Sequence, residues 1–83
     1  MNGQSVYQFK RKADEEVRIS LSHYKGARYV DLRIFYISKE DGEFKPTRKG
    51  ITLNLDLLSE LEKGIAMLKE AILSTNQPEE TIA

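Results

Sequence analysis

Residues 28–53, RYVDLRIFYISKEDGEFKPTRKGITL, carry the pattern that decides the fold. Residues 28–38 are rich in aromatic and β-branched side chains, which favour strands. A charged loop follows, with Asp41-Gly42 as its turn signal, and residues 44–53 return as a second strand. The sequence therefore predicts an antiparallel hairpin at the centre of the chain.

Two earlier segments extend this hairpin toward the N-terminus. In residues 16–24, apolar side chains alternate with Arg and Ser, the period of two that is typical of a half-buried strand. Lys25-Gly26-Ala27 is interpreted as a tight connection, with Gly26 available for positive φ. Residues 5–10 alternate more weakly and indicate a short strand. Four antiparallel strands are expected.

One helix is expected after the strands. Asn54 is a good N-cap, and Asp56 in the first turn favours the helix dipole. From Leu57 to Ile72, apolar residues recur every three to four positions, the stripe of a helix laid on a sheet. The fold class is therefore α+β, with one domain over residues 1–75 and a flexible C-terminal tail over residues 76–83.

The composition limits what this domain can be. A chain of 83 residues buries only roughly 60–65% of its unfolded surface, so stabilisation by a second copy is expected. There is no Cys, no apolar run long enough to span a membrane, and no apolar segment of a signal peptide at the start. These observations predict an intracellular protein with no membrane partner.

The zero net charge hides an uneven distribution. Residues 1–50 contain eleven Lys/Arg and seven Asp/Glu, a net charge of +4. Residues 51–83 contain two Lys/Arg and six Asp/Glu, a net charge of −4. Such a chain can present a basic face although its sum is neutral.

Signals of catalysis are weak. His23 is the single His, there is no Cys, and no phosphate-binding loop with spaced glycines occurs. Asp14-Glu15-Glu16 is interpreted as a charged run in a hairpin rather than as a metal or acid–base cluster. We expect no enzyme activity, no catalytic residue, no cofactor and no metal site.

Signals of nucleic-acid binding are stronger. Binding of single strands requires cations that follow the backbone and aromatic faces on which bases stack. Both residue types interleave here. Tyr24 is followed by Lys25 and Arg28, and Arg33 precedes Phe35 and Tyr36, although part of these aromatics could equally belong to the core.

The segment Lys45-Pro46-Thr47-Arg48-Lys49-Gly50-Ile51-Thr52-Leu53 resembles the signature Lys-Pro-x-Arg-Lys-Gly-Ile-Ser/Thr-Leu of the positive cofactor four family of transcriptional coactivators. Tyr29-Val30-Asp31-Leu32-Arg33, Asp41-Gly42-Glu43 and Tyr24-Lys25-Gly26 resemble further family segments, so that the likeness covers roughly residues 17–72.

The resemblance implies a curved four-stranded sheet, a C-terminal helix, and a symmetric homodimer whose helices pack at the centre. It also implies grooves for single-stranded DNA, with RNA left open. The family's stacking positions are occupied by Tyr24 and Tyr36. Its basic positions, or in one case the next residue, are occupied by Lys25, Arg28, Arg33, Lys45, Arg48 and Lys49. Ser22 stands where the animal proteins have Arg.

Two functions follow. The first is a single-stranded DNA-binding protein that acts as a transcriptional coactivator or regulator, with a role in replication or repair left open. It would bind by base stacking and phosphate neutralisation, with little sequence specificity. The alternative is a protein-interaction module that contacts transcription factors or polymerase, with nucleic-acid binding incidental.

Three assignments stay open. Simple alternation puts Tyr36 on the face of Val30 and Leu32, so Tyr36 can share a face with Arg33 only if the strand bulges or twists strongly. Lys10-Arg11-Lys12 could extend the binding surface, mimic a localisation signal or be a solvated charge run, and we favour the last. In the helix, Gly64 and Ala71 lie side by side with Met67 nearby, which would let a second helix approach; alternatively, Gly64 relieves crowding against the sheet.

Overall fold

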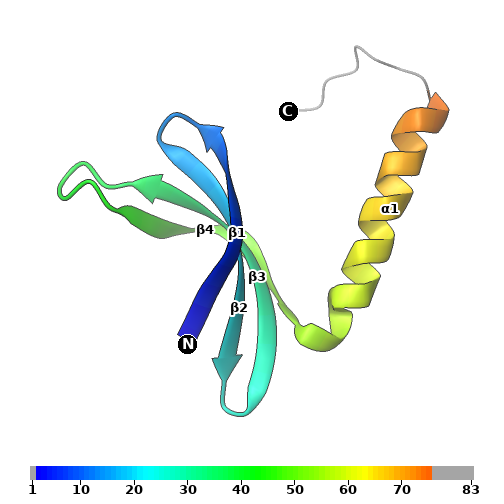
Figure 1. Ribbon diagram of the computed structural model, residues 1–83, viewed down its shortest axis with the longest axis horizontal. Helices are drawn as coiled ribbons and strands as arrows, with labels where there is room; N and C mark the ends of the chain where they lie inside the picture. The colour runs from blue at the N-terminus through cyan, green and yellow to red at the C-terminus, as the bar shows by residue number, and fades with distance from the viewer. Residues whose placement is uncertain (1, 76–83) are drawn as a thin grey trace.

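The computed structural model describes residues 2–75 as an open antiparallel sheet followed by one helix (Figure 1). The strands pair in chain order. The elements are β1 (Asn2–Lys12), β2 (Glu15–Tyr24), β3 (Ala27–Ile37), β4 (Phe44–Asn54), a 3-10 turn (Leu55–Leu57) and α1 (Leu58–Thr75). The predicted fold class is confirmed, whereas the predicted tail, residues 76–83, lies outside the described residues.

Three of the strands match their predicted boundaries within one residue, but β1 is longer than expected. It covers 11 residues instead of a short segment over residues 5–10, and it pairs with β2 along its length. The register shifts between Ser5 and Tyr7 and again near its end, which explains why alternation in the sequence is weak there.

The two predicted hairpin turns are confirmed. Between β2 and β3, both Lys25 (φ 51°) and Gly26 (φ 81°) are left-handed, as a two-residue hairpin that matches the strand twist requires. Between β3 and β4, Gly42 has φ 73°, and its N–H donates to the carbonyl of Ser38 over 2.8 Å.

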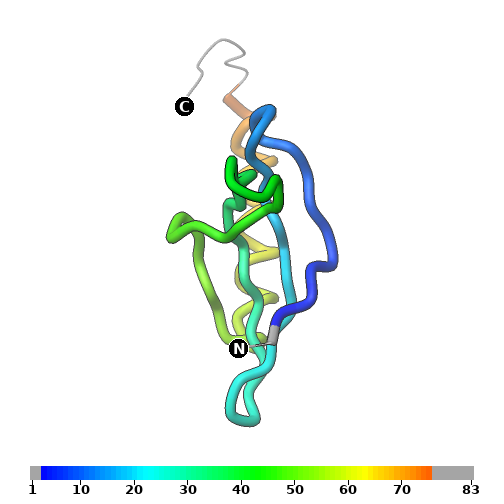
Figure 2. The backbone as a smooth tube through the Cα atoms, turned by 90° about the vertical axis from the view of Figure 1, so that its left-hand side faces the viewer, coloured from blue at the N-terminus to red at the C-terminus, as the bar shows by residue number. Residues whose placement is uncertain are grey.

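The register divides the sheet into an apolar and a polar face. Residues opposite each other in neighbouring strands point to the same face of the sheet. Ile19 and Leu32 therefore lie on the apolar face, and Ser20 and Asp31 lie on the polar face. Among the described residues, Val30 is the sole apolar side chain classed as buried, with 7% exposed. Figure 2 shows the strands bending strongly, in a molecule that measures 43 × 35 × 18 Å.

The helix does not lie on the sheet of its own chain, and that expectation is wrong. Asn54 caps the turn as predicted, its side-chain oxygen accepting from the N–H of Asp56 over 2.9 Å. From there α1 projects away from the strands (Figure 1), leaving Leu68 59% and Ile72 62% exposed. An apolar stripe shows that a face is suited to burial but not what buries it. No helix within residues 2–75 has the length and apolar character needed to cross a membrane.

Candidate nucleic-acid interface

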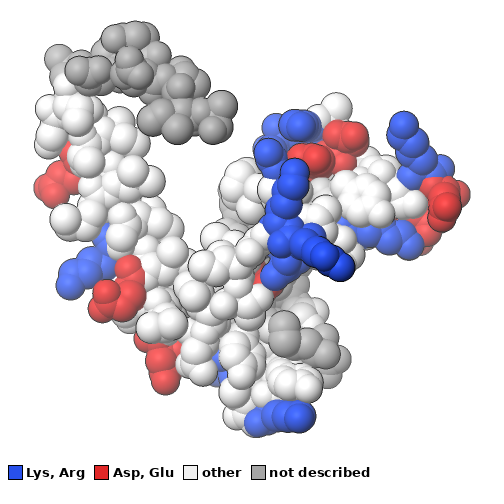
Figure 3. Space-filling view, turned by 180° about the vertical axis from the view of Figure 1, so that it is seen from behind, with Lys and Arg blue, Asp and Glu red and all other residues white. Residues whose placement is uncertain are grey.

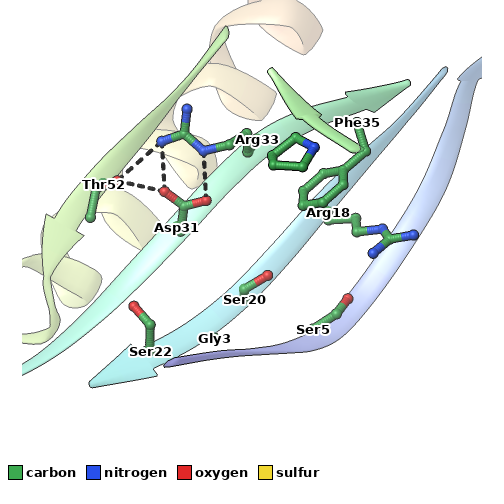
Figure 4. Close-up of a pocket in the computed structure, with 10 residues that line it drawn as sticks. Gly3, Ser5, Arg18, Ser20, Ser22, Asp31, Arg33, Phe35 and Thr52 are labelled. Carbon is green, nitrogen blue, oxygen red and sulfur yellow. Dashed lines mark hydrogen bonds and ion pairs between the residues drawn. The ribbon is translucent and has the colours of Figure 1, made fainter. Parts of the chain in front are cut away.

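The polar face of the sheet is hollowed into a cavity of about 540 Å³ (Figure 4). Side chains from all four strands line it. Because β2 alternates, Arg18, Ser20 and Ser22 point to this face while Val17, Ile19 and Leu21 point to the other.

An ion pair crosses the middle of this face. The Arg33 guanidinium donates to both oxygens of Asp31, over 3.0 and 2.9 Å, and to the hydroxyl of Thr52 over 3.2 Å (Figure 4). Burial opposes ionisation of Asp31, but the hydrogen bonds from Arg33 and Thr52 outweigh it and lower the pKa of Asp31. The hydrogen bond to Asp31 raises the pKa of Arg33. Arg33 is thus half-buried and paired with Asp31.

Arg33 also holds an irregular segment of β4. Gly50 pairs with Arg33 and Pro46 pairs with Phe35, so residues 47–49 bulge opposite Ile34. The guanidinium donates to the carbonyl of Thr47 over 3.0 Å, and the Thr47 hydroxyl donates to the carbonyl of Ile34 over 2.7 Å.

The bulge displays two of the expected cations. Arg48 and Lys49 are exposed, and within residues 2–75 neither forms an ion pair. Lys49 borders a hollow on the apolar side with Val17 and Leu32, so it does not share a face with the Arg33–Asp31 pair. Free surface cations of this kind suit phosphate oxygens.

Another cluster lies at the β2–β3 hairpin. Tyr24 is 48% exposed, and the Lys25 ammonium is 5.3 Å from the centre of its ring. Arg28 is the second residue of β3, exposed and opposite His23. By its position in β2, Tyr24 belongs to the polar face, and its alternative as a core residue is excluded.

Tyr36 lies near the far end of β3. It is 42% exposed, with Glu15 and Lys45 as its neighbours in register. The β2–β3 register runs without interruption, because the bulge is in β4. Tyr36 therefore stays on the face of Val30, and no bulge in β3 brings it to the face of Arg33.

Lys45, in register with Tyr36, is half-buried and paired. Its ammonium lies 3.0 Å from Asp41 in the β3–β4 loop. The backbone N–H of Glu43, and then Lys45, lower the pKa of Asp41.

The expected residues therefore form separate groups rather than one cluster. Tyr24 is in register with Ala27, and nine residues separate Ala27 from Tyr36, about 30 Å along an extended strand. Figure 3 shows Lys and Arg side chains gathered mainly over the sheet. Tyr24 and Tyr36 therefore lie near opposite ends of β3 and on opposite faces of the sheet.

Sequence reasoning missed Arg18. Its guanidinium lies 4.3 Å from the centre of the Phe35 ring and 5.2 Å from that of Phe44, and it contacts Glu16 at 2.6 Å. The available signal was its place among Ser20 and Ser22 in the alternation of β2.

The charged runs near the β1–β2 turn are paired locally, with Lys10-Arg11-Lys12 exposed and Glu16 buried. Arg11 lies 3.5 Å from Glu15, and Lys10 donates to the carbonyl of Ala13 over 3.3 Å. Within residues 2–75, no three His, Asp or Glu side chains lie close enough together to hold a metal ion.

Comparison with known proteins shows that most of the sheet and the start of the helix match a protein family. Residues 11–64 match the family described as Transcriptional Coactivator p15 (PC4). The chain is 34% identical over 55 residues to the RNA polymerase II transcriptional coactivator SUB1 of Saccharomyces cerevisiae. The aligned segment covers 66% of this chain and 19% of that protein. It is 39% identical over 51 residues to a putative RNA polymerase II transcriptional coactivator of Caenorhabditis elegans, covering 53% of this chain and 41% of that protein. The chain thus spans less than half the length of these curated relatives.

Solved structures agree with this likeness. A PC4 homolog from Burkholderia pseudomallei superimposes with a TM-score of 0.74 at 34% identity, over 82% of this chain and 90% of that chain. A bacteriophage T5 homolog of the eukaryotic coactivator PC4 superimposes with a TM-score of 0.61 at 22% identity, over 93% and 90% of the two chains, which supports the fold alone.

Proposed function

Because this chain belongs to the transcriptional coactivator p15 (PC4) family, we propose that it is a non-catalytic single-stranded DNA-binding protein acting in transcription. The observation that supports this best is the exposed Tyr24 ring with the Lys25 ammonium 5.3 Å from its centre. A base can stack on such a ring while the adjacent cation contacts the phosphate that follows.

The binding surface is centred on Tyr24 and Lys25 at the β2–β3 hairpin, whereas Tyr36 lies on the other face of the sheet. Arg48 and Lys49, exposed on the bulge, supply further phosphate contacts. Phosphate neutralisation provides most of the affinity and makes it depend on salt, whereas stacking requires unpaired bases. Neither effect reads sequence, so the protein binds single strands with little sequence preference.

A second copy of the chain completes the fold in this proposal. The apolar side chains of α1, among them Ile65, Leu68 and Ile72, are about half exposed on a helix that projects away from the strands (Figure 1). A two-fold helix–helix contact buries the same stripe in both copies. Gly64 leaves space for this approach, because a Cβ atom at that position would meet nothing within 4 Å in its own chain. The alternative in which Gly64 relieves crowding against the sheet is therefore excluded.

A protein-interaction role is the second candidate. The apolar sheet face exposes Tyr7 by 61% and Ile51 by 49%, and its central side chains, such as Ile19 and Leu32, are uncharged. An uncharged apolar surface suits a protein partner rather than DNA.

Fluorescence anisotropy with labelled oligothymidine of about 20 nucleotides separates the two candidates. Tyr24→Ala should weaken binding by about 5- to 150-fold, the loss of one stacked base, without changing the salt slope. Tyr7→Ala, which removes an equally exposed ring from the apolar face, is the matched control and should bind as the parent does.

Lys49→Ala tests the electrostatic part of the proposal. Removing one phosphate contact should reduce the slope of log affinity against log salt by about 0.7. Lys63→Ala, a helix cation, should leave it unchanged. Equal slopes for the Lys49 variant and the parent would contradict the proposed role of the bulge.

A further inference from the structure

The bulge of β4 is a segment whose side-chain directions are not fixed by the regular pairing of the strands. Residues 47–49 lie opposite Ile34 alone, between two regular pairs of the β3–β4 register. A bulge leaves residues outside the ladder and bends its strand locally. Other contacts must therefore set the directions in which Arg48 and Lys49 project.

Thr47 links this segment to β3 through its hydroxyl. The hydroxyl donates to the backbone carbonyl of Ile34 over 2.7 Å and accepts from the backbone N–H of Lys49 over 3.1 Å. A hydroxyl can donate and accept at the same time, so one side chain makes both bonds. Thr47 is half-buried, whereas Arg48 and Lys49 are exposed. The hydroxyl thus ties the backbone of an exposed cation to the neighbouring strand.

Arg33 holds the same residue from the polar face. Its guanidinium donates to the backbone carbonyl of Thr47 over 3.0 Å. Its remaining hydrogen bonds go to Asp31 and Thr52 (Figure 4). Together these bonds use four of the five N–H donors of an Arg side chain. Arg33 is therefore better suited to fixing the bulge than to binding a phosphate, which would have to compete with Asp31.

We propose that Thr47 is a positioning residue for strand binding, an inference that rests on the proposed function. Its hydroxyl fixes the bulge, and the bulge directs Arg48 and Lys49 toward the phosphates. In the family signature Lys-Pro-x-Arg-Lys-Gly, Thr47 stands at the position that is left open. The signature thus provides the cations, and the Thr47 hydroxyl of this chain constrains their direction.

Removing the hydroxyl while keeping the branched shape of the side chain tests this role. Thr47→Val should lower oligothymidine affinity about 2- to 10-fold, because one hydrogen bond of ordinary net strength no longer favours the binding conformation of the bulge. Thr47→Ser keeps a hydroxyl and should restore most of the affinity. Thr75→Val is the matched control, because it removes a hydroxyl that donates to the carbonyl of Ile72 over 3.1 Å within α1. It should bind as the parent does.

A double-mutant cycle separates positioning from a general contribution to the fold. In a chain that carries both Arg48→Ala and Lys49→Ala, the bulge has no cation left to direct. Adding Thr47→Val to that chain should therefore change the affinity by less than about 2-fold. A hydroxyl that only stabilised the sheet, or that bound the strand directly, would cost the same affinity in both backgrounds. Circular dichroism and urea unfolding check that each variant is folded.

The backbone amide of Lys49 gives a measurement that needs no DNA. Hydrogen exchange followed by NMR should show this amide protected in the parent and in Thr47→Ser. In Thr47→Val its exchange should be about 2- to 10-fold faster, because the acceptor is gone. Equal exchange in all three proteins would overturn the assignment of the hydroxyl as the constraint on the bulge.

The outcomes separate this inference from the proposed function. If the parent protein does not bind oligothymidine, the proposed function fails, and the positioning role fails with it. If the parent binds and Thr47→Val binds equally well, only the positioning role is overturned. The positioning role is also overturned if Thr47→Val weakens binding equally with and without the two cations.

Discussion

Replacing Gly50 with Ala should destabilise the sheet where the bulge of β4 meets β3. A Cβ atom there would lie 2.9 Å from the Cα of Arg33 and 3.1 Å from its Cβ, and closer still to the carbonyl oxygen of Leu32. Most of these atoms belong to the backbone of the neighbouring strand, so they cannot rotate away. The added methyl group must therefore push the two strands apart.

The expected cost follows from that geometry. Overpacking of this kind costs about 1–3 kcal/mol. In a domain of this size each kcal/mol lowers Tm by about 4–8 °C, so the Gly50→Ala variant should melt roughly 4–24 °C below the parent. The displacement also moves Arg48 and Lys49, so oligonucleotide affinity should fall as well.

Thermal unfolding followed by circular dichroism at fixed protein concentration measures this effect. Gly3→Ala is the matched control, because it adds the same methyl group to a strand glycine whose nearest contact would be an unstrained 3.8 Å. Its Tm should stay within a few degrees of the parent or rise. A Gly50→Ala variant that melts with the parent would refute the argument that close approach of the strands requires glycine there.

Two further predictions concern the ion pair and the helix. Because the folded chain lowers the pKa of Asp31 below its ordinary 3.8, the carboxylate stabilises the fold fully above that value and progressively less as the pH falls through the lower folded pKa. Asp31→Asn should therefore lower the free energy of unfolding in urea by about 1.5–3 kcal/mol at neutral pH. The difference between variant and parent should shrink below pH 4. A difference that is constant with pH would contradict the assignment. In α1, the side chain that Gly64→Leu adds would fill open space in its own chain but block the approach of a second helix. Light scattering should therefore show a lower dimer fraction. An unchanged dimer fraction would exclude a close contact at Gly64.

Local patterns in the sequence predicted the elements of this fold well. Alternation and turn residues located β2, β3 and β4, and Asn54 identified the start of the helix. These signals depend on backbone preferences over a few residues, so no distant contact is needed to interpret them.

Contacts between distant residues could not be read in the same way. The apolar stripe of α1 shows what can be buried but does not name its partner, so its departure from the sheet was missed. Alternation exposed the conflict at Tyr36, yet it could not show that β4 bulges and β3 does not. The bond from Arg33 to the carbonyl of Thr47 spans fourteen positions, so the sequence could not show it.

The candidate site residues were predicted only in part. Tyr24, Lys25, Arg48 and Lys49 were named from the resemblance to the family, and the structure leaves all four exposed. Arg18 was overlooked because its partner Phe35 comes from another strand. The cavity beside it depends on side chains from four strands.

Fluorescence anisotropy with one oligothymidine and its duplex of equal length, at about 50 and about 200 mM salt, tests the central claim most directly. The account predicts tight binding of the single strand, much weaker binding of the duplex because paired bases cannot stack on Tyr24, and a steep loss of affinity with salt. Equal affinity for both forms, or affinity that does not depend on salt, would contradict it.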